Sequence, residues 1–363
     1  MTRRRGTVNS ICIRRELMQK YADDPAAKFP RAILAHAPTR LEPLKNIMRA
    51  SGHPHLYVKR DDATGLAMGG NKARQLEYYF GAALAEGADT VLITGAVQSN
   101  FVRQCAAASR KLNLACEVQL EDRVQGMPPG QMEKGNALLD RILGVPIHRF
   151  AVGEDEDGAD NNLEKIADDI RARGGKPYVI HLGADHPPLG ALGYVDSARE
   201  IIEQTEALGV PLAAVVVASG SAASHAGMLG GLRHYGVDVP VHGICVRRNA
   251  DLQHARVLKR TLILGDMLGK PDLVSAEEVI TNDDYIGEGY GKPTPGTMKA
   301  IERGAREETL IMDPVYSGKA FDGFLSLVDD HTLPRDGAVV FVHTGGTPGL
   351  FAYGHLWDTR RAS

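Results

Sequence analysis

Lys72 follows two glycines, in Gly69-Gly70-Asn71-Lys72, at the start of an amphipathic stretch that runs to about Glu86 and ends at Gly87. This pattern predicts a helix with a lysine in its first turn. The helix dipole disfavours a cation there, and with desolvation it would lower the pKa of the amine. A neutral amine can form a Schiff base with a carbonyl group. The alternative is a surface lysine that happens to follow two glycines.

A second candidate is the run of small and hydroxyl residues 218–227, ASGSAASHAG, directly after the apolar run LAAVVV. A strand followed by a helix is expected here, so the N–H groups of the helix start would be available to an anion. Small residues let the backbone approach a phosphate, and Ser hydroxyls add donors. The run matches neither the P-loop nor the dinucleotide-binding fingerprint. It predicts a phosphate site, with an ordinary tight turn as the alternative.

A third candidate is Gln98-Ser99-Asn100, at another predicted switch from strand to helix. Amide and hydroxyl groups would lie there at the carboxyl edge of a sheet, where open α/β folds bind ligands. Ser99 and Asn100 could equally be only the N-cap of the following helix. The 13 histidines, among them His53, His55, His181 and His186, show no metal-ligand spacing, so no metal site is predicted.

Predicted strands and helices alternate along the chain, and these elements would position the candidate residues. Apolar runs without alternation, separated by helical patterns, predict parallel sheets covered by helices on both faces. Strands are expected at 90–94, 114–120, 147–150, 177–181, 212–218, 241–246 and 338–342, and helices at 101–112, 132–143, 163–173, 194–208 and 223–234. The acidic stretch Val152–Asn162 predicts a solvated loop, and residues 13–24 predict a short charged helix.

Composition excludes several classes of protein. The 363 residues, 43% hydrophobic, suffice for about two domains with buried cores. With 42 basic and 45 acidic residues, the net charge gives no indication that the protein binds a nucleic acid or a membrane surface. No apolar run approaches the roughly 18 residues of a membrane span, and no apolar segment follows Arg3-Arg4-Arg5 as a secretory signal would require. Four cysteines without a close pair indicate a reducing cytoplasm.

Taken in order, several motifs resemble one known family. They are Lys59-Arg60-Asp61-Asp62, Gly69-Gly70-Asn71-Lys72, Gln98-Ser99-Asn100, the 218–227 loop, Asp313-Pro314-Val315-Tyr316 and His343-Thr344-Gly345-Gly346. From about Phe29 to Trp357 the chain resembles the D-cysteine desulfhydrase / 1-aminocyclopropane-1-carboxylate deaminase family, pyridoxal 5′-phosphate enzymes of fold type II. The first 28 residues lie outside this resemblance.

The resemblance implies an α/β fold similar to the tryptophan synthase β chain. Two open twisted sheets with flanking helices would hold the cofactor between two domains. Residues 1–65 and 182–363 would form the large domain that binds pyridoxal phosphate, and residues 66–181 the small domain. A homodimer in the cytoplasm is also implied.

The resemblance further implies roles for individual residues. Lys72 would carry the cofactor, Asn100 would bind the ring hydroxyl, Ser317 would face the pyridine nitrogen, and Thr344 would also contact the cofactor. The phosphate would bind in the loop of Ser219, Gly220, Ser221, Ala222, Ala223 and Ser224. Tyr290 and Tyr316 would face the substrate, Ser99 would lie near its carboxylate, and Asn100 would also contact it. Phe101, Asp185 and His186, where the chain departs from the desulfhydrase pattern, are expected near the substrate or at the mouth of the cleft. The alternative is that Asp185-His186-Pro187-Pro188 is only a rigid loop before a helix.

Within the family, Tyr316-Ser317 is similar to the desulfhydrases, since the cyclopropane deaminases carry Glu after the tyrosine. Ala184-Asp185-His186-Pro187 looks more like the deaminases, and Phe101 stands where desulfhydrases commonly have His. A hydroxyl at 317 cannot stabilise a protonated pyridine nitrogen as a carboxylate does, which favours β-elimination over ring opening.

The activity expected is therefore α,β-elimination from a small β-substituted amino acid. The best candidate is D-cysteine, converted to pyruvate, ammonia and hydrogen sulfide. Alternatives are cyclopropane-carboxylate deamination and elimination from another substrate such as cysteate. Either Lys72 or Ser99 would take the Cα proton. An alternative of another class is a noncatalytic protein that binds a phosphorylated metabolite in the 218–227 loop.

Overall fold

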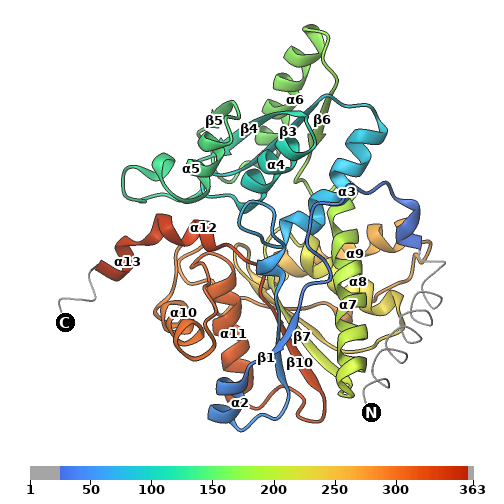
Figure 1. Cartoon of the computed structure of the whole chain (residues 1–363), viewed down its shortest axis with the longest axis vertical. Coiled ribbons are helices and arrows are strands. Elements are labelled where there is room, and N and C mark those ends of the chain that lie inside the picture. Colours follow the sequence, from blue (N-terminus) through green and yellow to red (C-terminus); the bar gives the residue numbers. More distant parts are fainter. Residues whose placement is uncertain (1–24, 359–363) are drawn as a thin grey trace, which may run out of the picture.

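The computed structural model describes residues 25–358, which form two twisted sheets with flanking helices (Figure 1). The predicted fold class is confirmed. The predicted helix over 13–24 lies outside the described residues.

The larger sheet has six strands in the order β1-β2-β10-β7-β8-β9, all parallel except β1, which pairs antiparallel with β2. The strands are β1 (Leu41–Pro43), β2 (Leu56–Lys59), β7 (Leu212–Ser219), β8 (Val241–Cys245), β9 (Ile280–Asn282) and β10 (Ala338–Val342).

Alternation along β10 shows how this sheet is buried on both faces. Val339 and Phe341 pack on α2 (Lys45–Ser51), α10 (Pro295–Glu308) and α11 (Ser317–Asp329). Val340 and Val342 pack on the opposite side, against α7 (Leu192–Leu208), α8 (Ala223–His234) and α9 (Ala250–Met267). Successive side chains of a strand point to opposite faces, so a strand covered twice needs an unbroken apolar run.

The smaller sheet has four parallel strands in the order β5-β4-β3-β6 and lies above the larger one in Figure 1. They are β3 (Thr90–Ala96), β4 (Ala115–Glu121), β5 (Ile147–Phe150) and β6 (Pro177–Ile180). Helices α3 (Lys72–Ala85) and α4 (Asn100–Lys111) cover one face, α6 (Glu156–Ala172) covers the other, and α5 (Gly135–Ile142) packs on α4. Short helices α12 (Thr347–Leu350) and α13 (His355–Asp358) follow β10.

The strands of the small sheet all fall within 66–181, and those of the large sheet all fall outside that range. The domain boundaries given above stay a prediction.

Within the described residues, all seven predicted strands and all six predicted helices have counterparts, with two differences in the helices. The helix expected at 132–143 is divided into a 3-10 turn, Gln131–Glu133, and α5. The loop prediction for Val152–Asn162 is wrong, because α6 begins at Glu156. Asp155 caps α6 by accepting from Gly158 N at 2.8 Å, and acidic residues in a first turn are favoured by the helix dipole.

A buried network of four charges joins the large sheet to the helix that begins at Lys72. Arg74 on α3 donates to both oxygens of Glu200 on α7, at 2.8 and 2.7 Å, and to Asp61 Oδ1 at 3.0 Å. Lys59, at the end of β2, donates to Glu200 Oε2 at 2.7 Å. Burial opposes ionisation of Glu200, but Arg74 and Lys59 hold its pKa below the usual value.

Glu200→Gln is expected to lower the free energy of unfolding by about 3–5 kcal/mol, since two buried cations would then face one carboxylate. Glu203→Gln, three residues along α7 and paired with Arg199 at 3.6 Å near solvent, should cost under about 1 kcal/mol. Urea denaturation at neutral pH measures both. In the parent, the same stabilisation should disappear as the pH falls through the depressed pKa of Glu200. Equal stability of the two variants would contradict this account.

Candidate active site

One cavity is lined by residues from both sheets. They come from the start of α3, the β3–α4 turn, the β7–α8 loop and later loops: Asn71, Lys72, Gly95, Ala96, Ser99, Asn100, Phe101, Arg123, Glu156, Leu182, Ala218, Gly220, Ser221, Ala222, Ser224, Arg247, Arg256, Tyr290, Tyr316, Thr344 and Gly345. Carboxyl ends of parallel strands meet at such an edge, so the predicted candidates converge here.

Lys72 is the first residue of α3 and faces this cavity. Its Nζ lies 3.3 Å from Gln75 Oε1, one turn along the helix, and 5.2 Å from the centre of the Phe101 ring. Burial, with a smaller contribution from the charge of Arg260, lowers the pKa of Lys72 to about 8. The predicted direction of the shift therefore agrees, and the amine is far more often neutral near pH 7 than that of an exposed lysine.

The two glycines before Lys72 are required by close backbone contacts. Gly69 and Gly70 have positive φ angles of 70° and 118°. A Cβ on Gly69 would lie 2.0 Å from the carbonyl oxygen of Asp62, and one on Gly70 would lie 2.7 Å from Gln104 Nε2. Asn71 N then donates to the carbonyl oxygen of Thr344 at 3.0 Å. The pair thus brings the helix start against the loop after β10.

The β7–α8 loop forms the opposite wall. Ala222 has a positive φ of 75°, and α8 begins at the next residue. Ser224 Oγ accepts from Asn71 Nδ2 at 3.0 Å and from Gln75 Nε2 at 2.9 Å, so its own O–H remains available to the cavity. Two residues predicted for the phosphate loop do not line the cavity, Ser219 and Ala223. Ser219 Oγ instead bonds His225 Nδ1 at 3.0 Å.

In the β3–α4 turn, Ser99 both caps the following helix and lines the cavity. Its hydroxyl accepts from Val102 N at 3.2 Å, which makes it the N-cap of α4, and it also lines the cavity. Asn100 lines the cavity beside it, with Oδ1 accepting from Asn136 Nδ2 at 2.9 Å. Phe101 completes this wall.

Tyr290 and Tyr316 both line the cavity and share a short hydrogen bond between their hydroxyl groups. Burial raises the pKa of both phenols, well above the usual value at Tyr316, so both stay protonated at neutral pH. One O–H is used between them, which leaves one proton for a ligand. The buried Lys319 holds the loop of Tyr290 by donating to the carbonyl oxygen of Gly289 at 2.9 Å.

A cluster of arginines around Glu156 was not predicted. Glu156 pairs with Arg247 at 2.8 Å, with Arg256 at 3.0 Å and also with Arg248. Burial opposes ionisation, yet the three arginines lower the pKa of Glu156 to about 2. The acidic first turn after Asp155 was the signal for this helix start, but its arginine partners lie about 90–100 residues further along the chain.

Three predicted ligand contacts are absent from the cavity lining: Asp185, His186 and Ser317. Asp185 is exposed and pairs with Lys259, and His186 stacks on His181. Ser317 is fully buried and donates to Asp313 Oδ2 at 2.7 Å, while Asp313 accepts from the backbone N–H groups of Val315 and Tyr316. Their roles toward cofactor and substrate stay predictions. Thr344 does line the cavity.

Comparison with known proteins places the chain in a family. Residues 33–345 match the family described as "Pyridoxal-phosphate dependent enzyme". The chain belongs to this family, and its cofactor is pyridoxal phosphate. Among residues 25–358, no helix is both long and apolar enough to cross a membrane.

Particular relatives narrow the class further. The chain is 42% identical over 328 residues to D-cysteine desulfhydrase of Salmonella paratyphi A, which covers 90% of this chain and 97% of the relative. D-cysteine desulfhydrase of Salmonella typhi is 41% identical over 326 residues, with the same coverage. A solved ACC deaminase homologue superposes with a TM-score of 0.83 at 35% identity, covering 94% of this chain and 98% of the other. The chain is thus a pyridoxal-phosphate dependent lyase.

Ser317→Ala is expected to lower the unfolding free energy of the cofactor-free protein by about 1.5–3 kcal/mol, because the hydroxyl donates to a buried carboxylate. Ser317→Thr keeps the hydroxyl and should retain most of the stability. Denaturation in urea measures both variants. An alanine variant as stable as the parent, but with altered cofactor absorbance, would contradict the structural role and favour the predicted contact with the pyridine nitrogen.

Proposed function

We propose that this protein catalyses α,β-elimination from a small β-substituted amino acid, with D-cysteine as substrate and pyruvate, ammonia and hydrogen sulfide as products. Support comes from the similarity to D-cysteine desulfhydrases along nearly their whole length. One observation carries the proposal within the site: the Gln75 side chain bridges the amine of Lys72 and the hydroxyl of Ser224. The amine and a hydroxyl of the predicted phosphate loop are thereby held against one side chain in the same cavity.

The residues present fit the cofactor. Lys72 would hold its aldehyde carbon, since its lowered pKa provides a neutral amine. Ser221, Ser224 and the N–H groups at the start of α8 would hold the phosphate, with Arg256 adding positive charge. Asn100 and Thr344 would flank the ring. When bound, pyridoxal phosphate supplies the sink for the electron pair left at Cα.

The chain's own residues would move the protons. Lys72 or Ser99 would take the Cα proton, since both line the cavity and each can present a lone pair. Breaking the Cβ–S bond then releases a thiolate that needs a proton. The Tyr290–Tyr316 pair lines the cavity and has one O–H left over, so it would donate to the departing sulfur.

A second candidate substrate is favoured by Arg123. This arginine lines the cavity and binds Glu121 through Nε and Nη2, at 2.7 and 2.8 Å, which leaves Nη1 for a ligand. Its charge also acts on both Tyr290 and Tyr316. A cation beside the proposed leaving-group donors suits a β-substituent that is itself anionic, such as the sulfonate of cysteate.

Ring opening of the cyclopropane amino acid is less favoured, since the chain resembles the desulfhydrases in having a hydroxyl residue, Ser317, directly after Tyr316. A cytoplasmic location is supported by Cys105, Cys116 and Cys245, which are buried and unpaired. The homodimer is proposed on the family resemblance.

Borohydride reduction of the holoenzyme followed by peptide mapping should place the phosphopyridoxyl group on Lys72. Lys72→Ala should fold normally, because the side chain faces the cavity, and it should lose both the label and sulfide release. A label on another lysine would refute the assignment. A purified protein without a visible cofactor band that responds to amino acids would favour the noncatalytic alternative.

A comparison of the parent with one double variant distinguishes D-cysteine from cysteate as the substrate. The double variant Glu121→Gln/Arg123→Gln removes a buried pair together, so it avoids leaving one charge unpaired. If cysteate is the substrate, the variant should lose at least tenfold in kcat/KM for sulfite release from cysteate. Sulfide release from D-cysteine should change by less than about threefold. Efficient turnover of the cyclopropane amino acid, with no sulfide from D-cysteine and no sulfite from cysteate, would rule out both substrate assignments.

A further inference from the structure

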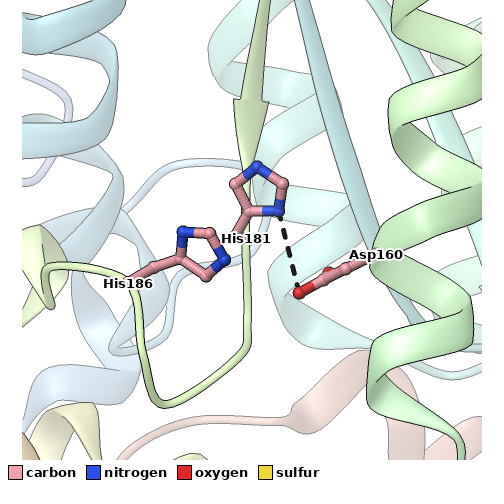
Figure 2. Close-up of side chains that lie close together, drawn as sticks. All are labelled: Asp160, His181 and His186. Carbon is pink, nitrogen blue, oxygen red and sulfur yellow. Dashed lines mark ion pairs between the residues drawn. The ribbon is translucent and has the colours of Figure 1, made fainter.

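A group of possible metal ligands lies outside the cavity, behind one of its walls. Asp160 lies on α6, one turn beyond Glu156, while His181 directly follows β6 and His186 lies in the loop after it (Figure 2). One ligand atom from each lies within 4.8 Å of the others. The spacing rules applied to the sequence could not find this group, because Asp160 comes from another element.

The tautomer of His181 is the strongest argument. Its Nε2 lies 3.0 Å from Glu164 Oε1, and Glu164 is itself held by Arg171 at 3.3 Å. A carboxylate cannot donate, so in the neutral imidazole Nε2 carries the proton and Nδ1 presents a lone pair. Such an outer carboxylate that orients a histidine is the usual neighbour of a metal-binding imidazole.

That lone pair faces an anion. His181 Nδ1 is buried without a hydrogen-bond partner, and Asp160 Oδ2 lies 3.7 Å away, too far for a hydrogen bond. Two ligands of a tetrahedral zinc ion, at bonds near 2.1 Å, are about 3.4 Å apart. The separation of these two atoms is therefore close to what a shared cation requires.

The third ligand, His186, has an exposed side chain that can rotate toward the other two. The ring of His186 stacks on that of His181, with centroids 4.1 Å apart and planes at 11°, and its side chain is exposed. Parallel rings do not converge on one ion, so His186 must rotate about its side-chain bonds. Gly183 leaves the space open, since a Cβ there would lie 3.2 Å from Asp160 Oδ2 and 3.4 Å from His186 Cδ2.

We propose that Asp160, His181 and His186 bind one divalent transition-metal ion of the zinc type. Two imidazole nitrogens and one carboxylate oxygen suit this class of ion and leave a fourth position for water. Imidazole binds a metal ion through an unprotonated nitrogen, so the ion would compete with protons for both histidines.

The ion would brace the wall of the cavity. Glu156 begins the helix that carries Asp160, and Leu182 follows His181; both line the cavity. Arg256 and Arg260 each donate to the carbonyl oxygen of Leu182 at 2.8 Å. A metal joining α6 to this loop would therefore limit movement of the arginines that face the phosphate loop.

The test is calorimetric titration of Zn²⁺ into the full-length holoenzyme after treatment with a chelator, with cofactor absorbance followed to show that pyridoxal phosphate is retained. One ion per chain is expected. Asp160→Asn and His186→Ala should each weaken binding at least tenfold, and Glu164→Gln about tenfold to a hundredfold. His148→Ala is the matched control, since His148 pairs with Glu117 at 2.7 Å in the same sheet and should leave affinity unchanged.

Two results would overturn the proposal. The first is absence of saturable Zn²⁺ binding at tens of micromolar, which would mean that a proton on His181 alone balances Asp160. The second is binding that persists undiminished in His186→Ala and Asp160→Asn, which would assign the ion to other ligands. Neither result bears on the lyase activity, so failure here is distinct from failure of the proposed function.

Discussion

The ion pair between Arg74 and Glu200 sets the position on which the rest of the site depends. Arg74 lies two residues beyond Lys72 on α3, and Glu200 lies on α7, which packs on the large sheet. Buried pairs contribute little net stability compared with apolar packing, and their strict geometry is their main effect. We infer that this network orients the start of α3, so that the amine of Lys72 reaches the cavity formed with the β7–α8 loop.

The charged side chains that line the cavity are mostly positive. Arg123, Arg247 and Arg256 line it against a single lining carboxylate, Glu156. The positive excess suits an anionic cofactor and an amino-acid carboxylate. The same field, through Arg260, acts with burial to keep the pKa of Lys72 low. Burial is the larger cause of the lowered pKa of Lys72, and the charge of Arg260 adds to it.

Much of the fold was predictable because it rests on local patterns. Apolar runs buried on both faces marked β3, β7 and β10, and the helices between them showed helical periodicity. Strands β1, β2 and β9, of three or four residues, were missed, since so short a segment is a strand only through its partner in the sheet. The start of α6 was missed because its acidic residues were read as solvent-exposed, although Asp155 is a typical N-cap.

Three features of the cavity could be read from the sequence, because each depends on neighbours along the chain: Lys72 at a helix start after two glycines, the small-residue loop before α8 and the polar turn before α4. Tertiary structure alone decided which side chains face the cavity. It buried Ser317 against Asp313, turned Asp185 outward to Lys259, and brought Glu156 to arginines that follow β8. Packing between distant elements also placed Asp160, His181 and His186 close together. Such partners are set by packing between elements distant in sequence, and no local pattern encodes a contact across that distance.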